Sequence, residues 1–255
     1  MALYSVDVLR LFPGPHTFAL GGWYRLFHTT YIHLFWRSAE LALIVSALVV
    51  AAAYPLAYFL ALSGTRRKYV LLLLLIAPFL TSYLLRVLAW KVILGNGGVI
   101  NSFLAWTGLW GHPLSFLLYS RFAVMLVLAY IWLPFVALPI FVSLESLDRN
   151  LLEAASDLGA SRRWAFLRVT LPLSVPGIFA GFLFVFIPTL GEFVTPSLVG
   201  GASGYLYGNQ IVDLFGAGFP DWETGSVLSI FLLVVVAALT VIFSRFLRTG
   251  QVAAR

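Results

Sequence analysis

Five long apolar runs follow one another along the chain, separated by short polar or glycine-containing stretches. A helix needs about 20 consecutive apolar residues to cross a lipid bilayer, and each run reaches that length. The runs cover residues 39–62, 69–94, 122–143, 172–199 and 226–247. Pro55 predicts a kink in the first run, and prolines and glycines interrupt the fourth. The pattern therefore predicts an all-α integral membrane domain over residues 39–248.

The composition also indicates a membrane protein, because hydrophobic residues make up 61% of the 255 residues and charged residues only 10%. An ordinary soluble domain carries about 25% charged residues, and a soluble monomer of this length could not bury so much apolar surface. The absence of cysteine excludes disulfides and thiolate metal sites. The four histidines lack HExxH spacing, so we expect no metal site.

The positions of the basic residues predict how the chain is oriented. The 16 Lys and Arg residues lie mostly at the ends of apolar runs, which does not fit a nucleic-acid-binding face. If the helices alternate, ten of them fall on one side, which the positive-inside rule makes cytoplasmic. These ten are Arg66, Arg67, Lys68, Arg149, Arg162, Arg163, Arg168, Arg245, Arg248 and Arg255. We therefore expect a cytoplasmic loop at 144–170, a cytoplasmic tail at 249–255 and an extracytoplasmic segment at 1–38, which carries no signal-peptide pattern.

A short charged segment stands out in the 144–170 loop. Leu151, Leu152 and Ala155 recur at helical spacing, and Gly159 can end the helix with a positive φ. A helix over 151–160 is too short to be stable alone in water, so it must pack against something. The residues alone leave two alternatives open: a plug for a groove in a partner protein, or an amphipathic helix on the membrane surface.

The spacing of this segment resembles the EAA signature of ABC importer permeases. Glu153, Ala154 and Ala155 are followed at the family's intervals by Gly159 and then by Val169, Leu171 and Pro172. In that family the EAA loop forms a coupling helix that docks into a cleft of a cytoplasmic ATPase. The resemblance therefore implies the plug, with coupling residues Glu153, Ala154, Ala155, Asp157, Gly159, Leu171 and Pro172.

Longer stretches resemble the spermidine/putrescine permeases within this family. They include "APFLTSYLLRVLAWKVIL", "IWLPFVALPIF" and the run that follows the EAA segment. The resemblance implies a type I ABC importer permease fold in a bacterial inner membrane, and import of a polyamine or a similar small organic cation. It further implies two copies of an ATPase subunit, a second homologous permease and a substrate-binding protein. Members usually have six spans, so we expect the family's first helix to be missing here.

The chain itself has no means of hydrolysing ATP. A P-loop requires a lysine followed by Ser or Thr, whereas Lys68 precedes Tyr69 and Lys91 precedes Val92. We therefore expect a transport subunit rather than an enzyme, with no bound cofactor. ATP and Mg would be used by the separate ATPase.

Glu192 is an acid near the outer end of the fourth run. A charge at that depth costs roughly 2.5–3.5 kcal/mol on insertion scales, so it is expected to face a cavity or a partner. One hypothesis places Glu192 on the translocation path, where it attracts a cation. The other is a structural ion pair with Arg86 or Lys91.

Three aromatic residues are candidates for cation–π contacts along such a path: Tyr83, Trp90 and Trp132. Packing or contact with lipid explains them as well. The acids Asp213, Asp221 and Glu223 lie in an outer loop, where they could meet a binding protein or simply face solvent. An ion- or proton-coupled transporter that titrates Glu192 is the alternative function, and a structural membrane scaffold is a third.

Overall fold

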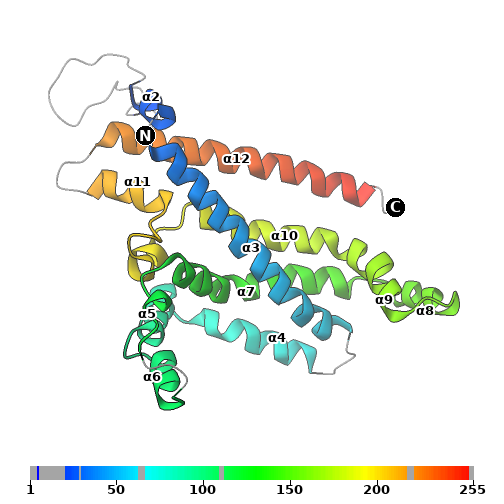
Figure 1. Ribbon diagram of the computed structural model, residues 1–255. Coiled ribbons are helices and arrows are strands. Elements are labelled where there is room, and N and C mark those ends of the chain that lie inside the picture. Colours follow the sequence, from blue (N-terminus) through cyan, green and yellow to red (C-terminus); the bar gives the residue numbers. More distant parts are fainter. Residues whose placement is uncertain are drawn as a thin grey trace. The chain divides into compact units, whose positions relative to one another are not determined.

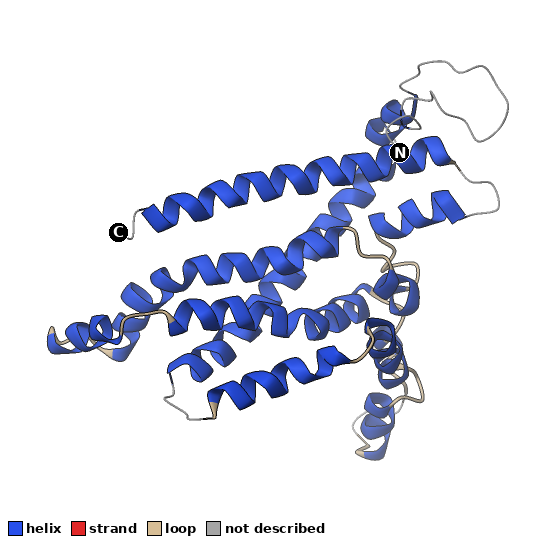
Figure 2. Cartoon of the chain, turned by 180° about the vertical axis from the view of Figure 1, so that it is seen from behind, coloured by secondary structure: helices blue, strands red, loops and turns tan. Residues whose placement is uncertain are grey.

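A computed structural model describes residue 5 and residues 21–28, 30–62, 67–108, 112–216 and 221–252. These residues are largely helical and contain no strand, which confirms the all-α prediction (Figure 1, Figure 2). Most of the expected extracytoplasmic segment before residue 21 lies outside the described residues, as do Arg66 and Arg255 of the expected cytoplasmic side.

Five helical stretches are long and apolar enough to cross a membrane, judged by length and composition. They are Thr30–Leu62, Tyr83–Trp106, Arg121–Glu145, Arg162–Leu190 and Trp222–Ser244. The single helices among them are α3 (Thr30–Leu62), α7 (Arg121–Glu145), α10 (Leu171–Leu190) and α12 (Trp222–Val252). Helix α3 begins nine residues before the first apolar run, and Pro55 lies inside it without ending it.

Shorter elements connect the long helices. In chain order these are α2 (Gly21–His28), α4 (Lys68–Ile76), η1 (Ala77–Leu80), α5 (Tyr83–Leu94), α6 (Val99–Trp106), η2 (Ser115–Leu117), α8 (Arg149–Asp157), α9 (Arg162–Ala165), η3 (Phe166–Thr170), η4 (Pro196–Gly200) and α11 (Tyr207–Gly216).

The second apolar run, 69–94, is not one continuous helix. Pro78 has no N–H to donate to the preceding turn, and after Ile76 the backbone tightens into the 3-10 helix η1. Thr81 is extended and its Oγ1 donates to the Pro78 carbonyl at 2.6 Å. Helix α5 then starts afresh at Tyr83. The stretch that reaches a membrane-spanning length here is 83–106, which comprises α5 and α6, and 68–80 forms a shorter apolar stretch.

Contacts divide the chain into two compact units. The first comprises Met1–Leu43, Val87–Val127 and Ile187–Arg255; the second comprises Ile44–Arg86 and Leu128–Phe186. In the first unit, α2 and α11 pack against α12 (Figure 1). A buried cluster around Phe35, Tyr207 and Leu228 forms its core.

In the second unit, α7 and α10 approach closely enough for their backbones to touch. A Cβ on Gly177 would lie 2.5 Å from Ser143 Cβ and 2.6 Å from the Pro139 carbonyl oxygen. A Cβ on Gly181, one turn later, would lie 2.9 Å from Val136 Cγ1. Small residues four apart allow such close packing between membrane helices. The glycines of the fourth apolar run therefore serve packing, and α10 is continuous across both.

A candidate coupling hairpin and a broken helix

Helix α8 contains the EAA residues and carries its own start and stop signals. The Asp148 side chain accepts a hydrogen bond from the Asn150 N–H at 3.0 Å, which caps the first turn. At the other end, the N–H of Gly159 donates to the Ser156 carbonyl at 2.9 Å, and that of Ala160 to the Ala155 carbonyl at 3.0 Å. This is the Schellman arrangement, and Gly159 has φ +80° as it requires.

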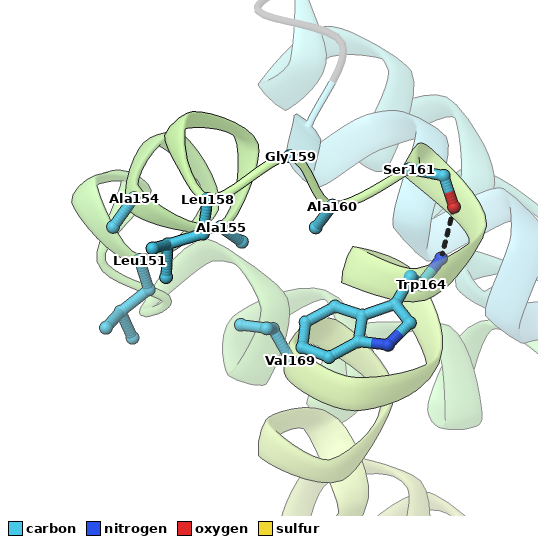
Figure 3. A pocket seen from close by; sticks show the side chains of 9 residues that line it. All are labelled: Leu151, Ala154, Ala155, Leu158, Gly159, Ala160, Ser161, Trp164 and Val169. Carbon is cyan, nitrogen blue, oxygen red and sulfur yellow. Dashed lines mark hydrogen bonds between the residues drawn. The ribbon is translucent and has the colours of Figure 1, made fainter.

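After this stop the chain turns back beside α8 (Figure 3). Ser161 accepts a hydrogen bond from the Trp164 N–H at 3.3 Å and so caps α9. A π-helical turn, η3, then leads into α10. Pro172 has no N–H for the carbonyl one turn earlier, and a widened turn is one way for a helix to accommodate that loss. We call residues 148–170 the coupling hairpin.

A shallow groove of about 610 Å³ runs along the coupling hairpin, and Figure 3 shows the side chains that line it. Four of the residues that carry the EAA resemblance line this groove: Ala154, Ala155, Gly159 and Val169. Ala155 is buried, whereas Ala154 and Gly159 are exposed. Residues from α8, the turn after it, α9 and η3 thus meet on one surface.

The remaining EAA residues lie elsewhere. Glu153 and Asp157 are exposed on α8 outside the groove lining, while Leu171 and Pro172 begin α10. Large apolar side chains are also exposed on the hairpin: Leu158 is 89% accessible, Trp164 50% and Leu151 47%. The helix expected over 151–160 ends at Asp157, so Leu158 follows its last residue, and its exposed side chain lines the groove.

Two contacts join the base of the hairpin to other helices of the second unit. The Tyr54 hydroxyl of α3 lies 3.1 Å from Ser174 Oγ of α10, and its ring packs edge-on against Phe166. The Lys68 ammonium at the start of α4 pairs with Glu145 at the end of α7. Lys68 was expected only to lie on the cytoplasmic side, and nothing in the sequence pointed to Glu145 because its partner lies 77 residues away.

Glu192 lies in a break of the fourth span rather than inside a helix. Helix α10 ends at Leu190, and helical structure resumes at residue 194 and runs through η4. Glu192 Oε1 accepts a hydrogen bond from the Thr195 N–H at 3.0 Å, which satisfies an unpaired donor of the new helix. Its side chain is half-buried, and its other oxygen has no hydrogen-bond or ion-pair partner among the described residues.

The other candidates for the translocation path are divided between the units. Trp90 and Glu192 belong to the first unit, and Tyr83 and Trp132 to the second, so the four do not form one site within either unit. All four are half-buried. Of the two cations considered as partners of Glu192, Lys91 lies 5.8 Å from the Tyr119 ring centroid. Arg86 lies in the second unit, 4.3 Å from the Phe79 ring centroid.

The three outer acids have local partners in the first unit. Asp221 caps α12 by accepting from the Thr224 N–H at 3.0 Å, and Arg25 pairs with Asp221 at 3.6 Å and with Glu223 at 2.9 Å. Asp213 accepts from the Tyr205 hydroxyl at 2.6 Å. Burial and this hydrogen bond raise the pKa of Tyr205 above its ordinary value. No group of three or more histidines and acids able to hold a metal occurs among the described residues.

Residues 53–249 match the family described as "Binding-protein-dependent transport system inner membrane component". The chain belongs to this family. It is a multi-pass inner-membrane transport component and not an enzyme. The resemblance to ABC importer permeases is thereby confirmed.

Several curated relatives within this family are similar to the chain over most of its length. The chain is 39% identical over 228 residues to the spermidine/putrescine transport system permease protein PotB of Escherichia coli K12, a match that covers 89% of this chain and 82% of the relative. PotB of Salmonella typhimurium LT2 is equally similar, with 79% of its length covered. The molybdenum permease ModB of Haemophilus influenzae is 35% identical over 60% of this chain and 67% of its own.

Solved structures share the fold. A bacterial ABC transporter involved in the import of the acidic polysaccharide alginate has a TM-score of 0.71 and 20% identity, covering 96% of this chain and 87% of the other. An amino acid ABC transporter has a TM-score of 0.53 and 20% identity, and the match covers 86% of this chain and 95% of the other. At this identity the likeness supports the ABC importer permease fold alone.

Proposed function

We propose that the chain is the membrane-spanning permease subunit of an ATP-binding cassette importer that carries a polyamine or a similar small organic cation. Its relatives at 39% identity are named spermidine/putrescine permeases. Glu192 has a half-buried carboxylate, and one of its oxygens has no partner among the described residues. Such a negatively charged group is what a cationic substrate would bind. Its position in a helix break also suits a site that lines a cavity.

Energy for transport enters through the coupling hairpin. The observation that carries this proposal is a groove whose lining includes the exposed apolar side chains of Leu151, Leu158 and Trp164 together with small residues. A hydrophobic patch on a polar loop is typical of a protein-binding surface. Hydrogen-bonded caps at both ends of α8 define where this helix starts and stops and so position Leu151 and Leu158.

The proposed assembly contains two ATPase subunits, a second homologous permease and a substrate-binding protein. ATP and Mg belong to the ATPase, and this chain holds no cofactor. The coupling hairpin and the C-terminus face the cytoplasm of a bacterium, as the distribution of basic residues favours. Closure of the ATPase pair moves α8, and the helices at its base pass this movement to the path. Glu153, Ala154, Ala155, Asp157, Gly159, Leu171 and Pro172 form or support the coupling surface.

A pull-down from mild detergent tests the coupling surface. Leu158→Asp places a charge at a site that is 89% accessible and makes little packing contact. We expect the ATPase to co-purify with the wild type and to be lost from this variant. Val212→Asp on α11, outside the five candidate spans and with a side chain that is 42% accessible, is the control and should retain the ATPase. Equal recovery of the ATPase with both variants would reject the hairpin as the docking surface.

Uptake into proteoliposomes containing the whole importer tests the path. Glu192→Gln keeps the size and the hydrogen-bond acceptor but removes the charge. We expect the KM for putrescine or spermidine to rise about tenfold, the scale of one ion pair in a partly buried site. An unchanged KM would remove Glu192 from the path. Uptake that follows a proton gradient and does not need ATP would favour the ion-coupled alternative.

A further inference from the structure

The segment that carries Glu192 is held by three consecutive residues at the start of α11: Tyr207, Gly208 and Asn209. From this geometry we propose that Asn209 is a positioning residue, which fixes the segment 191–197 and thereby the carboxylate of Glu192. This inference rests on the proposed role of Glu192 in the translocation path. Every residue involved belongs to the first unit.

Asn209 is 5% exposed, and its amide bonds to the segment directly. Its Nδ2 donates to the Phe193 carbonyl at 2.9 Å and to Ser197 Oγ at 2.7 Å. Its Oδ1 accepts from the Leu206 N–H at 3.1 Å. Both donors and the acceptor of the amide are therefore used, and Phe193 directly follows Glu192.

Gly208 allows α11 to rest on the backbone of the break itself. A Cβ at this position would lie 2.5 Å from the Gly191 carbonyl oxygen and 2.6 Å from that of Glu192. Both atoms belong to backbone, so neither can move aside as a flexible side chain would. Only glycine permits this approach.

Tyr207 anchors the start of α11 to two other helices. It is fully buried, its N–H donates to Ser38 Oγ of α3 at 2.8 Å, and its hydroxyl donates to the Leu228 carbonyl of α12 at 3.1 Å. Its ring packs against Phe35 at 5.5 Å between centroids. Asn209 thus follows a residue that is held in place by α3 and α12, and its hydrogen bonds hold the segment 191–197 against the start of α11.

The consequence is a division of roles between adjacent elements. Glu192 supplies the charge, and one of its oxygens is used by Thr195. Where the second oxygen points depends on the backbone of 191–193, which the Thr195 bond cannot hold by itself. Asn209 supplies that support from outside the segment.

The chain contains no cysteine, so a single Cys at position 192 reports on this position alone. In the assembled importer, we would label Glu192→Cys with the neutral reagent N-ethylmaleimide and follow modification of this chain by mass. Asn209→Asp keeps the acceptor for the Leu206 N–H and removes the donations to Phe193 and Ser197. Asn209→Ala removes all three hydrogen bonds without adding charge. We expect each to change the labelling rate about tenfold, the scale of one buried hydrogen bond.

Asn101 is a matched control in the same unit. It is also 5% exposed, donates to the Gly95 carbonyl at 3.0 Å and accepts from the Leu114 N–H at 2.8 Å. Asn101→Asp and Asn101→Ala should lower thermal stability and leave the labelling rate at position 192 unchanged. If the Asn101 variants change the labelling rate at position 192 as much as the Asn209 variants do, the effect is a general loosening of the protein, and the proposal is overturned.

Uptake kinetics then connect the position to transport. Asn209→Asp should raise the KM for putrescine about tenfold in the wild type and leave it unchanged in the Glu192→Gln background, because the two residues act as one unit. Additive effects, or no effect of Asn209→Asp, would overturn the positioning role and leave the importer standing. If Glu192→Gln itself transports with wild-type KM, both Glu192 and its positioning residue lose their role. Labelling at position 192 does not depend on the substrate. It therefore distinguishes a failure of Asn209 to position Glu192 from a wrong choice of substrate in the uptake assay.

Discussion

The hydroxyl of Tyr54 donates to Ser174 Oγ, 3.1 Å away, and so joins α3 to α10 at the base of the coupling hairpin. The direction follows because Ser174 has one hydroxyl hydrogen and donates it to the Leu171 carbonyl at 2.9 Å. Ser174 is fully buried. The contact therefore connects the first turn of α10 to a helix that lies far from it in the sequence.

Tyr54→Phe should lower the free energy of unfolding by about 1 kcal/mol, because it removes this hydrogen bond and keeps the ring. Thermal unfolding in detergent measures the change. Tyr58→Phe is the control: that ring also packs against Phe166, at 5.6 Å, and its hydroxyl has no partner among the described residues. Equal losses in the two variants would mean that the Tyr54 bond contributes nothing of its own.

Asp148 caps α8, and Asp148→Ala should cost the hairpin about 1 kcal/mol because the Asn150 N–H loses its acceptor. The affinity of the purified permease for its ATPase should fall, since α8 then frays before docking. Asp148→Ser supplies a replacement oxygen and should restore binding. A Ser variant as weak as the Ala variant would point to the charge of Asp148, not its capping, as the important property.

Gly159→Ala should weaken ATPase binding through the backbone alone. The left-handed φ of +80° costs a residue with a Cβ about 1 kcal/mol, and a Cβ here would meet nothing within 4 Å. Gly159→Asn should be tolerated better, because asparagine adopts this conformation more readily. Gly216→Ala, equally open and without a positive φ, should leave binding unchanged. Full binding by the Ala variant would contradict the expectation.

Gly177→Ala should destabilise the second unit by about 1–3 kcal/mol, because the methyl group would overlap Ser143 and the Pro139 carbonyl. The melting temperature in detergent measures the loss. Gly97→Ala provides the comparison, since a Cβ there would meet nothing within 4 Å. If both variants melt alike, α7 and α10 do not depend on backbone contact at this point.

The architecture was largely predictable because hydrophobic runs of membrane-spanning length dominate the sequence. The break within 69–94 was not, because a proline in an apolar run does not always end a helix: Pro55 lies inside α3, whereas Pro78 begins the 3-10 helix η1. The end of α8 was predictable from Gly159, because one local requirement, a positive φ, identifies it.

The support of Glu192 was hidden for a different reason. Asn209 resembles any polar residue of a loop in sequence, and its importance depends on partners 12 and 16 residues away. The available signal was a Gly-Asn pair directly after an aromatic residue, Tyr207, at the start of a helix. The groove on the coupling hairpin was likewise beyond reach, because it depends on how α9 and η3 fold back beside α8.

The backbone contact at Gly177 and Gly181 has a mechanical consequence for the hairpin. Helix α7 leads into the 146–170 segment and α10 leads out of it, and the two glycines leave no layer of side chains between these helices that could slide. Helices α7 and α10 are therefore expected to move as one rigid pair when the coupling hairpin is displaced. Helix α10 continues past both glycines to Leu190, two residues before Glu192, so such a movement would reach the start of that segment.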